Sequence, residues 1–224
     1  QEEKSRRQEE REQRAAQAMK PDRIAVLGAG GFLGSHLVPG LIERFGCPID
    51  AVDVDFDKLE CMDPRVRRIV ARVEEPSLVD EVTRRSTLVL SLTALCNPAL
   101  YSTVPLDVID ANFTHLLPLV RRCAERRIRL IHFSTAEVYG RRALDTDGAA
   151  MDEMNEDASA LVLGPIAKQR WSYACAKQLL ERVIWAHGEA GPSLGRAVLR
   201  GVAGVHLLHE EVDVVDHRVG VAPR

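Results

Sequence analysis

The chain has 224 residues, of which 46% are hydrophobic and 28% are charged. Its 30 Lys and Arg residues are nearly balanced by 33 Asp and Glu residues, which gives a formal net charge of -3. This composition supports a folded core and excludes wholesale disorder, and the lack of a basic excess argues against nucleic acid as the main partner.

Neither a membrane nor an oxidising compartment is indicated by the sequence. The apolar runs are shorter than the roughly 18 residues that a membrane span needs. The five cysteines are scattered and form no C-x-x-C pair, so we predict neither a disulfide framework nor a zinc knuckle. We therefore expect a cytoplasmic protein with no membrane partner.

The first 18 residues mix acidic and basic side chains closely and contain almost no large apolar ones. Such a segment has no face to bury, so we expect residues 1–20 to form a charged, disordered leader that plays no part in function. Met19 stands just before the first apolar run and is a candidate start of translation.

From Arg23 onward, short apolar runs alternate with segments of helical periodicity. The apolar runs, which we predict to be strands, are Ile24–Gly28, Ile49–Val54, Val66–Val70, Leu88–Leu92 and Ile128–Phe133. The predicted helices are Phe32–Arg44, 76–84, 105–127 and 167–187. The alternation predicts an α/β domain over residues 21–192, with a doubly wound parallel sheet of the Rossmann type and the strand order 3-2-1-4-5-6.

A glycine-rich turn follows the first predicted strand. Gly28, Gly31 and Gly34 have the spacing G-x-x-G-x-x-G, and Phe32 and Leu33 open the helix between the last two. Glycine allows a tight turn and a close approach of the backbone to a pyrophosphate, which the free N–H groups at a helix N-terminus then bind. We predict that these five residues bind a dinucleotide; the alternative is a glycine turn with a structural role only.

Asp53 ends the second predicted strand. A carboxylate at that place accepts hydrogen bonds from the adenosine ribose and disfavours a 2′-phosphate, so we predict NAD as the cofactor.

Tyr173 and Lys177 are four residues apart on a predicted helix and therefore share one face. A lysine ammonium beside a phenol stabilises the phenolate, and the lowered pKa makes tyrosine a base near neutral pH. The fifth predicted strand runs into Ser134 and Thr135, and we expect a hydroxyl of this segment in the same pocket. A surface pair on an ordinary helix is the alternative interpretation of this spacing.

These motifs resemble the extended short-chain dehydrogenases/reductases. The segments 130–140 (LIHFSTAEVYG), 168–178 (KQRWSYACAKQ) and 94–101 (ALCNPALY) are similar, more narrowly, to the branch that acts on UDP-glucuronate. This branch contains the UDP-apiose/UDP-xylose synthases and the UDP-glucuronate decarboxylase domain of the bacterial lipid A–arabinose pathway. The resemblance covers roughly residues 22–190.

The resemblance implies NAD-dependent oxidative decarboxylation of UDP-glucuronate to a UDP-pentose or its 4-keto form. Tyr173, tuned by Lys177, would take the proton of the sugar 4-hydroxyl, which Thr135 would hydrogen-bond. Lys177 would also contact the cofactor, and Glu137 would assist near the carboxylate. Tyr101 and Arg170 would contact the substrate, and a guanidinium suits bidentate binding of a carboxylate.

Two alternatives to this function remain open. One is a nucleotide-sugar 4-epimerase or dehydratase, and the other is an NAD-binding fragment without turnover. A homodimer through the helices 105–127 and 167–187 is expected by resemblance only. Ala136 stands where the relatives carry serine or cysteine, which argues against ring contraction to apiose, although Cys96 matches a cysteine of the apiose synthases.

Residues 193–224 form a tail of different composition. They contain no aromatic residue, and eight of the 32 are valine. The family would continue there with a strand and a small substrate domain, so we expect a truncation or a frameshift near residue 193. The tail is also dense in His, Asp and Glu between His206 and His217, but the spacing matches no ligand motif, and we predict no metal site.

Overall fold

The computed structural model describes residues 20–140, 162–189 and 196–199. The expected leader up to residue 19 and the expected tail from residue 200 onward lie outside the described residues. The histidines and acidic residues of that tail lie outside them as well.

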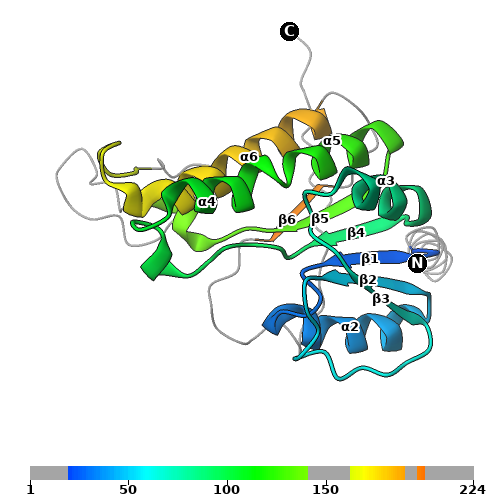
Figure 1. Ribbon diagram of the computed structural model, residues 1–224. Coiled ribbons are helices and arrows are strands. Elements are labelled where there is room, and N and C mark those ends of the chain that lie inside the picture. The colour runs from blue at the N-terminus through cyan, green and yellow to red at the C-terminus, as the bar shows by residue number, and fades with distance from the viewer. Residues whose placement is uncertain (1–19, 141–161, 190–195, 200–224) are drawn as a thin grey trace, which may run out of the picture.

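The described strands form one parallel sheet of six strands (Figure 1). The strands are β1 (Ile24–Leu27), β2 (Ile49–Asp53), β3 (Val66–Val70), β4 (Leu88–Ser91), β5 (Arg129–Phe133) and β6 (Arg196–Leu199). Their order in the sheet is β3-β2-β1-β4-β5-β6, and Ile24 of β1 is paired with Ile49 on one side and Leu88 on the other. The predicted doubly wound parallel sheet and its strand order are confirmed.

The sheet continues past the predicted domain boundary. β6 lies parallel to β5, with a register that runs from Leu130 opposite Arg196 to Phe133 opposite Leu199. The expected tail began at residue 193, so its first residues include a strand of the sheet. The division of the chain at residue 192 stays a prediction, and the sixth strand lies beyond it.

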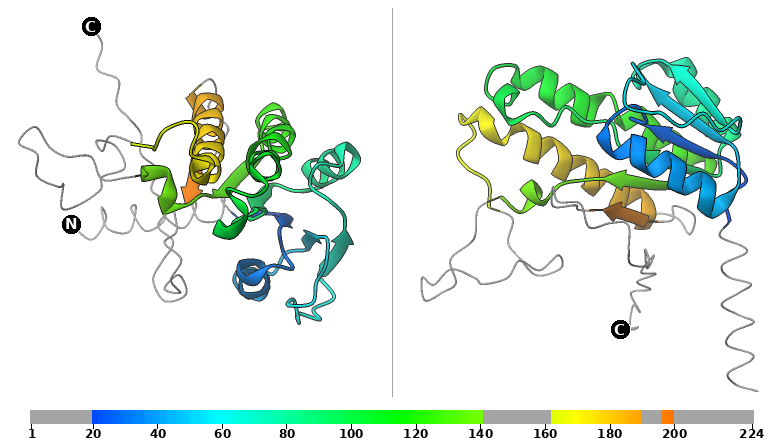
Figure 2. Two further views of the ribbon diagram at one scale, coloured as in Figure 1. Left: turned by 60° about the vertical axis from the view of Figure 1, so that its left-hand side comes forward. Right: turned by 90° about the horizontal axis from the view of Figure 1, so that it is seen from below.

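Helices cover both faces of the sheet. They are α2 (Phe32–Phe45), α3 (Pro76–Arg85), α4 (Pro105–Ile109), α5 (Leu117–Arg126) and α6 (Ser172–Glu189). Figure 2 shows α3, α5 and α6 on one face, whereas α2 lies on the opposite face beside β1 and β2. Three 3-10 turns, Pro98–Leu100, Ala136–Tyr139 and Gln169–Trp171, lie in the connections.

Each face of the sheet has its own apolar core, because successive side chains of a strand point to opposite faces. Leu27 of β1 belongs to the core with α3, α5 and α6, and Val26 belongs to the core with α2. β1, which leads into the glycine turn, is thus buried on both faces and fixed in position. The candidate site lies at the carboxyl ends of the strands.

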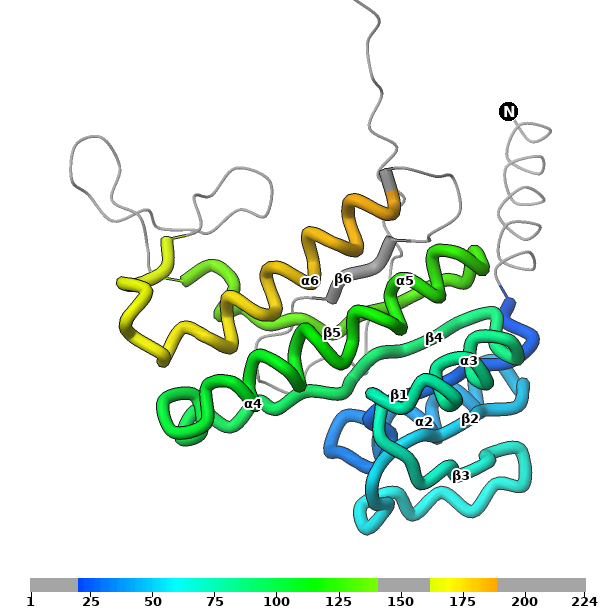
Figure 3. Tube along the Cα trace, turned by 45° about the horizontal axis from the view of Figure 1, so that its top comes forward, coloured from blue at the N-terminus to red at the C-terminus, as the bar shows by residue number. Residues whose placement is uncertain are grey.

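The segment 105–127, predicted as one helix, is divided. A π-helical turn, Asp110–Thr114, separates α4 from α5, and the path runs beside α6 (Figure 3). Inside this turn the Asn112 side chain donates to the carbonyl of Val108 at 2.7 Å and to that of Leu95 at 3.1 Å. A side chain that takes the carbonyl four residues back competes with the helical ladder. Pro118 then lies in the first turn of α5, where its missing N–H costs nothing.

Candidate active site

The predicted site residues lie at the carboxyl ends of the strands. The strand order reverses between β1 and β4, and in doubly wound sheets ligands bind at this point. The glycine turn follows β1, Asp53 ends β2 and Thr135 follows β5. Tyr173 and Lys177 approach from α6, which packs against the turn after β5. The fold therefore gathers both predicted motifs along one edge.

The glycine turn is closely packed by its own chain. Gly28 has a φ of +87°, a left-handed conformation that glycine adopts readily. A Cβ on Gly34 would lie 2.5 Å from the Ala29 Cα and the Gly28 oxygen. At Gly31 a Cβ would meet only the Gly28 oxygen, at 3.4 Å, so the mouth of the turn is open. This is the shape of a cradle for a pyrophosphate.

The N-terminus of α2 faces that mouth. Gly31 is its N-cap residue, and no side chain caps the helix. The first N–H groups of a helix have no intrahelical acceptor, and the helix dipole favours an anion there. Phe32 and Leu33 expose their side chains at this point. The residues present therefore fit a diphosphate.

Asp53 ties the second strand to the glycine turn. One carboxylate oxygen accepts from the Gly30 N–H at 2.9 Å, and the other accepts from the Val54 N–H at 2.7 Å. Each oxygen keeps a further lone pair for a ribose hydroxyl. Gly30 was not among the predicted site residues, and a Cβ there would lie 1.9 Å from the Asp55 oxygen. Its adjacency to Gly31 was the only signal in the sequence.

Tyr173 and Lys177 are both buried, with exposed fractions of 5% and 1%. The Lys177 Nζ donates to the Phe133 carbonyl oxygen at 3.0 Å. The side chains of Thr135 and Tyr173 are hydrogen-bonded to each other, as expected for a pocket that holds both hydroxyls. Thr135 also accepts from the Glu137 N–H at 3.2 Å and so begins the 3-10 turn that carries Glu137.

One electrostatic expectation is wrong for the structure as it stands. Lys177 was expected to lower the pKa of Tyr173, but burial raises that pKa to about 12, against a smaller lowering by the Thr135 hydrogen bond. Burial also lowers the pKa of Lys177 to about 8, although Cys96 and Glu181 counteract this. Desolvation penalises the charged form of both groups and outweighs their attraction.

The predicted substrate residues meet above Tyr173. The rings of Tyr101 and Tyr173 are stacked with centroids 4.8 Å apart. The Arg170 guanidinium lies over the Tyr101 ring, 5.2 Å from its centroid, and pairs with the Glu137 carboxylate at 2.7 Å. Burial, and then the charge of Glu137, raise the pKa of Tyr101. The arginine thus stands within reach of an anion placed over the two rings.

The structure brings the predicted residues into two groups. The cofactor group is Gly28, Gly31, Phe32, Leu33, Gly34 and Asp53, and the reaction group is Tyr101, Thr135, Glu137, Arg170, Tyr173 and Lys177. Sequence reasoning gave no committed role to three polar residues behind the reaction group, namely the buried His132 and Glu181 and the half-buried Ser134. Glu181 follows Lys177 by four residues, which was its signal in the sequence.

The described residues contain no group of three or more His, Cys, Asp and Glu side chains placed to hold a metal ion. Among the same residues, no helix is both long enough and apolar enough to span a membrane.

A doubly wound sheet with a glycine turn after β1 and a Tyr–Lys pair facing the end of β5 defines a dinucleotide-dependent enzyme fold of the short-chain dehydrogenase type. Residues 24–202 match the NAD dependent epimerase/dehydratase family, and the chain belongs to that family. NAD is the cofactor of this family, as the sequence predicted.

Plant synthases are among the relatives of the chain. It is 43% identical over 184 residues to the UDP-D-apiose/UDP-D-xylose synthase of Oryza sativa subsp. japonica, covering 75% of this chain and 46% of that protein. It is 40% identical over 186 residues to UDP-D-apiose/UDP-D-xylose synthase 1 of Arabidopsis thaliana, covering 76% and 48%. The chain spans about half the length of these curated relatives.

Solved structures give the same fold. PbgP3 from Burkholderia pseudomallei is 33% identical, with a TM-score of 0.73 over 80% of this chain and 57% of that protein. MoeE5 in complex with UDP-glucuronic acid and NAD is 25% identical, with a TM-score of 0.61 over 80% and 54%.

Proposed function

We propose that this chain is the cofactor-binding part of an NAD-dependent decarboxylase of UDP-glucuronate. The observation that carries the proposal is Arg170, which lies over the ring of Tyr101 and pairs with Glu137, while Tyr101 is stacked on Tyr173. A guanidinium in that place selects a sugar that carries a carboxylate. The similarity to the plant synthases supports the same substrate.

The chain's own residues fit the cofactor. The open mouth at Gly31 and the N-terminus of α2 would hold the pyrophosphate, and Asp53 would accept from the adenosine ribose. Lys177 would reach the other ribose from α6. NAD, when bound, accepts the hydride that leaves C4 of the sugar and adds a positive charge near Tyr173, which favours the phenolate.

Tyr173 would act as the base of the oxidation. It takes the proton of the 4-hydroxyl while Thr135 holds that hydroxyl in place. The bound sugar becomes a 4-keto acid whose carboxylate is β to the ketone. Loss of carbon dioxide breaks the bond between C5 and C6, and the electron pair passes into the ketone as an enolate.

Glu137 and Arg170 would manage the charge of this step. Their ion pair leaves both groups partly exposed, so a substrate carboxylate can replace Glu137 on the guanidinium. Glu137 then stands next to the carbon that takes up a proton after decarboxylation. Ala136 supplies neither a proton nor a thiol, so the product we favour is an unbranched UDP-pentose or its 4-keto form rather than the branched pentose apiose.

The test uses the full chain with NAD and UDP-glucuronate labelled with carbon-13 at C6. Nuclear magnetic resonance follows the label into carbon dioxide, and calorimetry measures NAD binding. Because the chain spans about half of its relatives, we expect NAD binding with little or no turnover. If labelled carbon dioxide is released, Tyr173→Phe must abolish the release. Arg170→Met must weaken UDP-glucuronate binding, and Arg182→Met, at an exposed position, serves as the control that does not.

The three candidate functions predict different results in this experiment. Release of labelled carbon dioxide supports the decarboxylase and contradicts the expected lack of turnover. Conversion to the 4-epimer with the label retained supports an epimerase and overturns the proposal. NAD binding without UDP-sugar binding identifies a cofactor-binding part that needs further residues to hold its substrate.

A further inference from the structure

A buried carboxylate, that of Glu181, lies behind the Tyr–Lys pair. Glu181 follows Lys177 by four residues and Tyr173 by eight, so the three side chains form one stripe along α6. Glu181 is 3% exposed. A carboxylate taken out of water is stable only with partners, and the Ser134 hydroxyl donates a short hydrogen bond to it.

This stripe meets three successive residues at the end of β5. Lys177 donates to the carbonyl of Phe133, Glu181 accepts from the hydroxyl of Ser134, and Tyr173 is hydrogen-bonded to Thr135. The contact between Ser134 and Glu181 therefore fixes the end of β5. It lies between the contacts made by Lys177 and Tyr173, on which the proposed reaction depends. If Ser134 moved, the Phe133 carbonyl and the Thr135 hydroxyl would move with it.

We propose that Glu181 is a positioning residue, which holds the end of β5 through Ser134 and places its charge one helical turn from the ammonium group of Lys177. The proposal rests on the roles given above to Tyr173 and Lys177. Glu181 itself stands behind Lys177 and is not proposed to touch substrate or cofactor.

The charges around Lys177 support this role. Burial lowers its pKa to about 8, and Cys96, in the segment after β4, and Glu181 raise it. His132 of β5 is the remaining described titratable group that interacts with it. His132 is fully buried, its Nδ1 lies 3.2 Å from the Ser91 hydroxyl, and its Nε2 has no hydrogen-bond partner within the described structure. Burial, together with the Lys177 charge, lowers the pKa of His132 well below its usual value, so the ring is neutral.

Glu181 is therefore the carboxylate that faces Lys177 along α6. Without its charge, only the Phe133 carbonyl and Cys96 would oppose the effect of desolvation on the ammonium. A neutral Lys177 neither binds a ribose as a cation nor stabilises a phenolate on Tyr173.

The experiment titrates Lys177 in the full chain. The sequence has five lysines, so carbon-13 labelling of lysine gives few signals, and Lys177→Arg assigns the one that matters. Glu181→Gln keeps an oxygen for Ser134 and removes the charge. Glu125→Gln makes the same chemical change at an exposed place on α5. Cys96→Ser provides a background in which Glu181 acts alone.

We expect Glu181→Gln to lower the pKa of Lys177 by ~0.5–1 unit, in both backgrounds, and Glu125→Gln to leave it unchanged. A folded Glu181→Gln protein with an unaltered Lys177 pKa overturns the proposal. If that variant does not fold, the pKa of Lys177 is measured in Ser134→Ala instead. It frees the carboxylate from its hydrogen bond and should raise the pKa of Lys177, and no change there overturns the proposal as well.

The titration needs neither NAD nor UDP-glucuronate, so its failure differs from a failure of the proposed function. Glu181→Asp has a shorter side chain but keeps the charge. A Lys177 pKa that returns to the wild-type value in this variant would confirm that the carboxylate acts through its charge. A pKa in Glu181→Asp as low as in Glu181→Gln contradicts this.

Discussion

Two glycines of α2 differ sharply in their surroundings. Gly34 packs against Ala29 and the Gly28 carbonyl, whereas a Cβ on Gly40 would meet nothing within 4 Å. We expect Gly34→Ala to lower the free energy of unfolding by ~1–3 kcal/mol, because the turn must shift, and to weaken NAD binding. We expect Gly40→Ala to raise it by ~0.5–1 kcal/mol through helix propensity. Urea unfolding measures both, and equal effects would contradict the close packing of the turn.

Lys177 makes stability depend on pH. Its pKa is about 8 in the fold and about 10.4 in the unfolded chain. Between these values the unfolded chain binds more protons, so the free energy of unfolding rises with pH, by ~3 kcal/mol in total. Below pH 8 both states are protonated, and the whole cost of the buried ammonium remains.

Lys177→Met should remove that rise. The free energy of unfolding is measured at about pH 7.5 and about pH 9.5 for the wild type and for the variant. The difference between the two proteins at one pH is then compared with their difference at the other. Buried thiols and phenols titrate in the same range, but they are common to both proteins and cancel. The exposed Lys58→Met serves as the control. A difference that does not change with pH would mean that Lys177 is not desolvated.

At the scale of single residues, the sequence predicted best those that act through their own chemistry. Asp53 and Thr135 were found because a strand ends beside them, and Lys177 because it follows Tyr173 by four residues. Ser134 and His132 were given no role of their own, since their importance comes from what α6 and β4 bring against them. A contact between segments that are 47 residues apart leaves no mark in local spacing.

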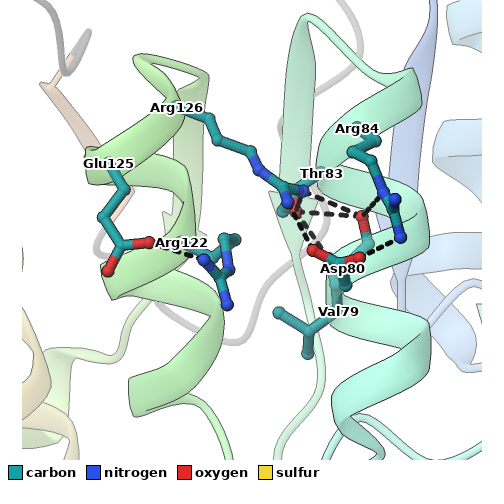
Figure 4. A network of polar contacts seen from close by, with 7 residues as sticks. All are labelled: Val79, Asp80, Thr83, Arg84, Arg122, Glu125 and Arg126. Carbon is teal, nitrogen blue, oxygen red and sulfur yellow. Dashed lines mark hydrogen bonds and ion pairs between the residues drawn. The ribbon is translucent and has the colours of Figure 1, made fainter.

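Arg126 fastens helix α5 to helix α3 (Figure 4). Its guanidinium donates to the Asp80 carbonyl at 2.9 Å and to the buried Thr83 hydroxyl at 2.7 Å, and it pairs with the Asp80 carboxylate. Arg122, one turn earlier, pairs with Glu125 on its own helix at 2.8 Å. One arginine therefore links two helices, and the other does not.

We expect Arg126→Met to lower the free energy of unfolding by ~1–2 kcal/mol, and Arg122→Met to change it by less than ~0.5 kcal/mol. Arg126 lowers the pKa of Asp80, so the part of this stabilisation that comes from the Asp80 carboxylate is present above the unfolded pKa of about 3.9 and is lost as the pH falls below it, whereas the hydrogen bonds to the Asp80 carbonyl and to Thr83 remain. Thermal unfolding at neutral pH and in acid measures both variants. Equal losses from the two substitutions would show that the link between α3 and α5 is not stabilising.

Elements were predictable where the pattern was continuous. The strand Val66–Val70 has the predicted bounds, and α2 and α3 end within one residue of the prediction. The division of the segment 105–127 into α4 and α5 was not predictable, because its apolar periodicity continues across the break. The division depends on the contacts of Asn112 with Leu95 and Val108, and a periodicity argument does not include them.

For the molecule as a whole, the described sheet extends past the predicted boundary at residue 192, which stays a prediction. β6 adds four residue pairs to the edge of β5. An unpaired β5 would present its hydrogen-bonding groups at an open edge, close to Phe133 and the reaction group. The composition of residues 193–224 could not show this, because it averages over the whole segment and does not single out the four residues Arg196–Leu199 that pair with β5.

Two shortened chains test whether β6 belongs to the folded unit. A chain that ends at residue 199 keeps the strand, and we expect it to unfold at the same temperature as the full chain and to bind NAD equally well. A chain that ends at residue 189 loses the strand, and we expect its Tm to fall by ~5 °C or more, since even ~2 kcal/mol shifts a chain of this size by that amount. Calorimetric scanning and NAD titration give both quantities. The chain ending at residue 199 controls for removal of the last residues, so equal Tm values for the two shortened chains would show that β6 does not stabilise the sheet.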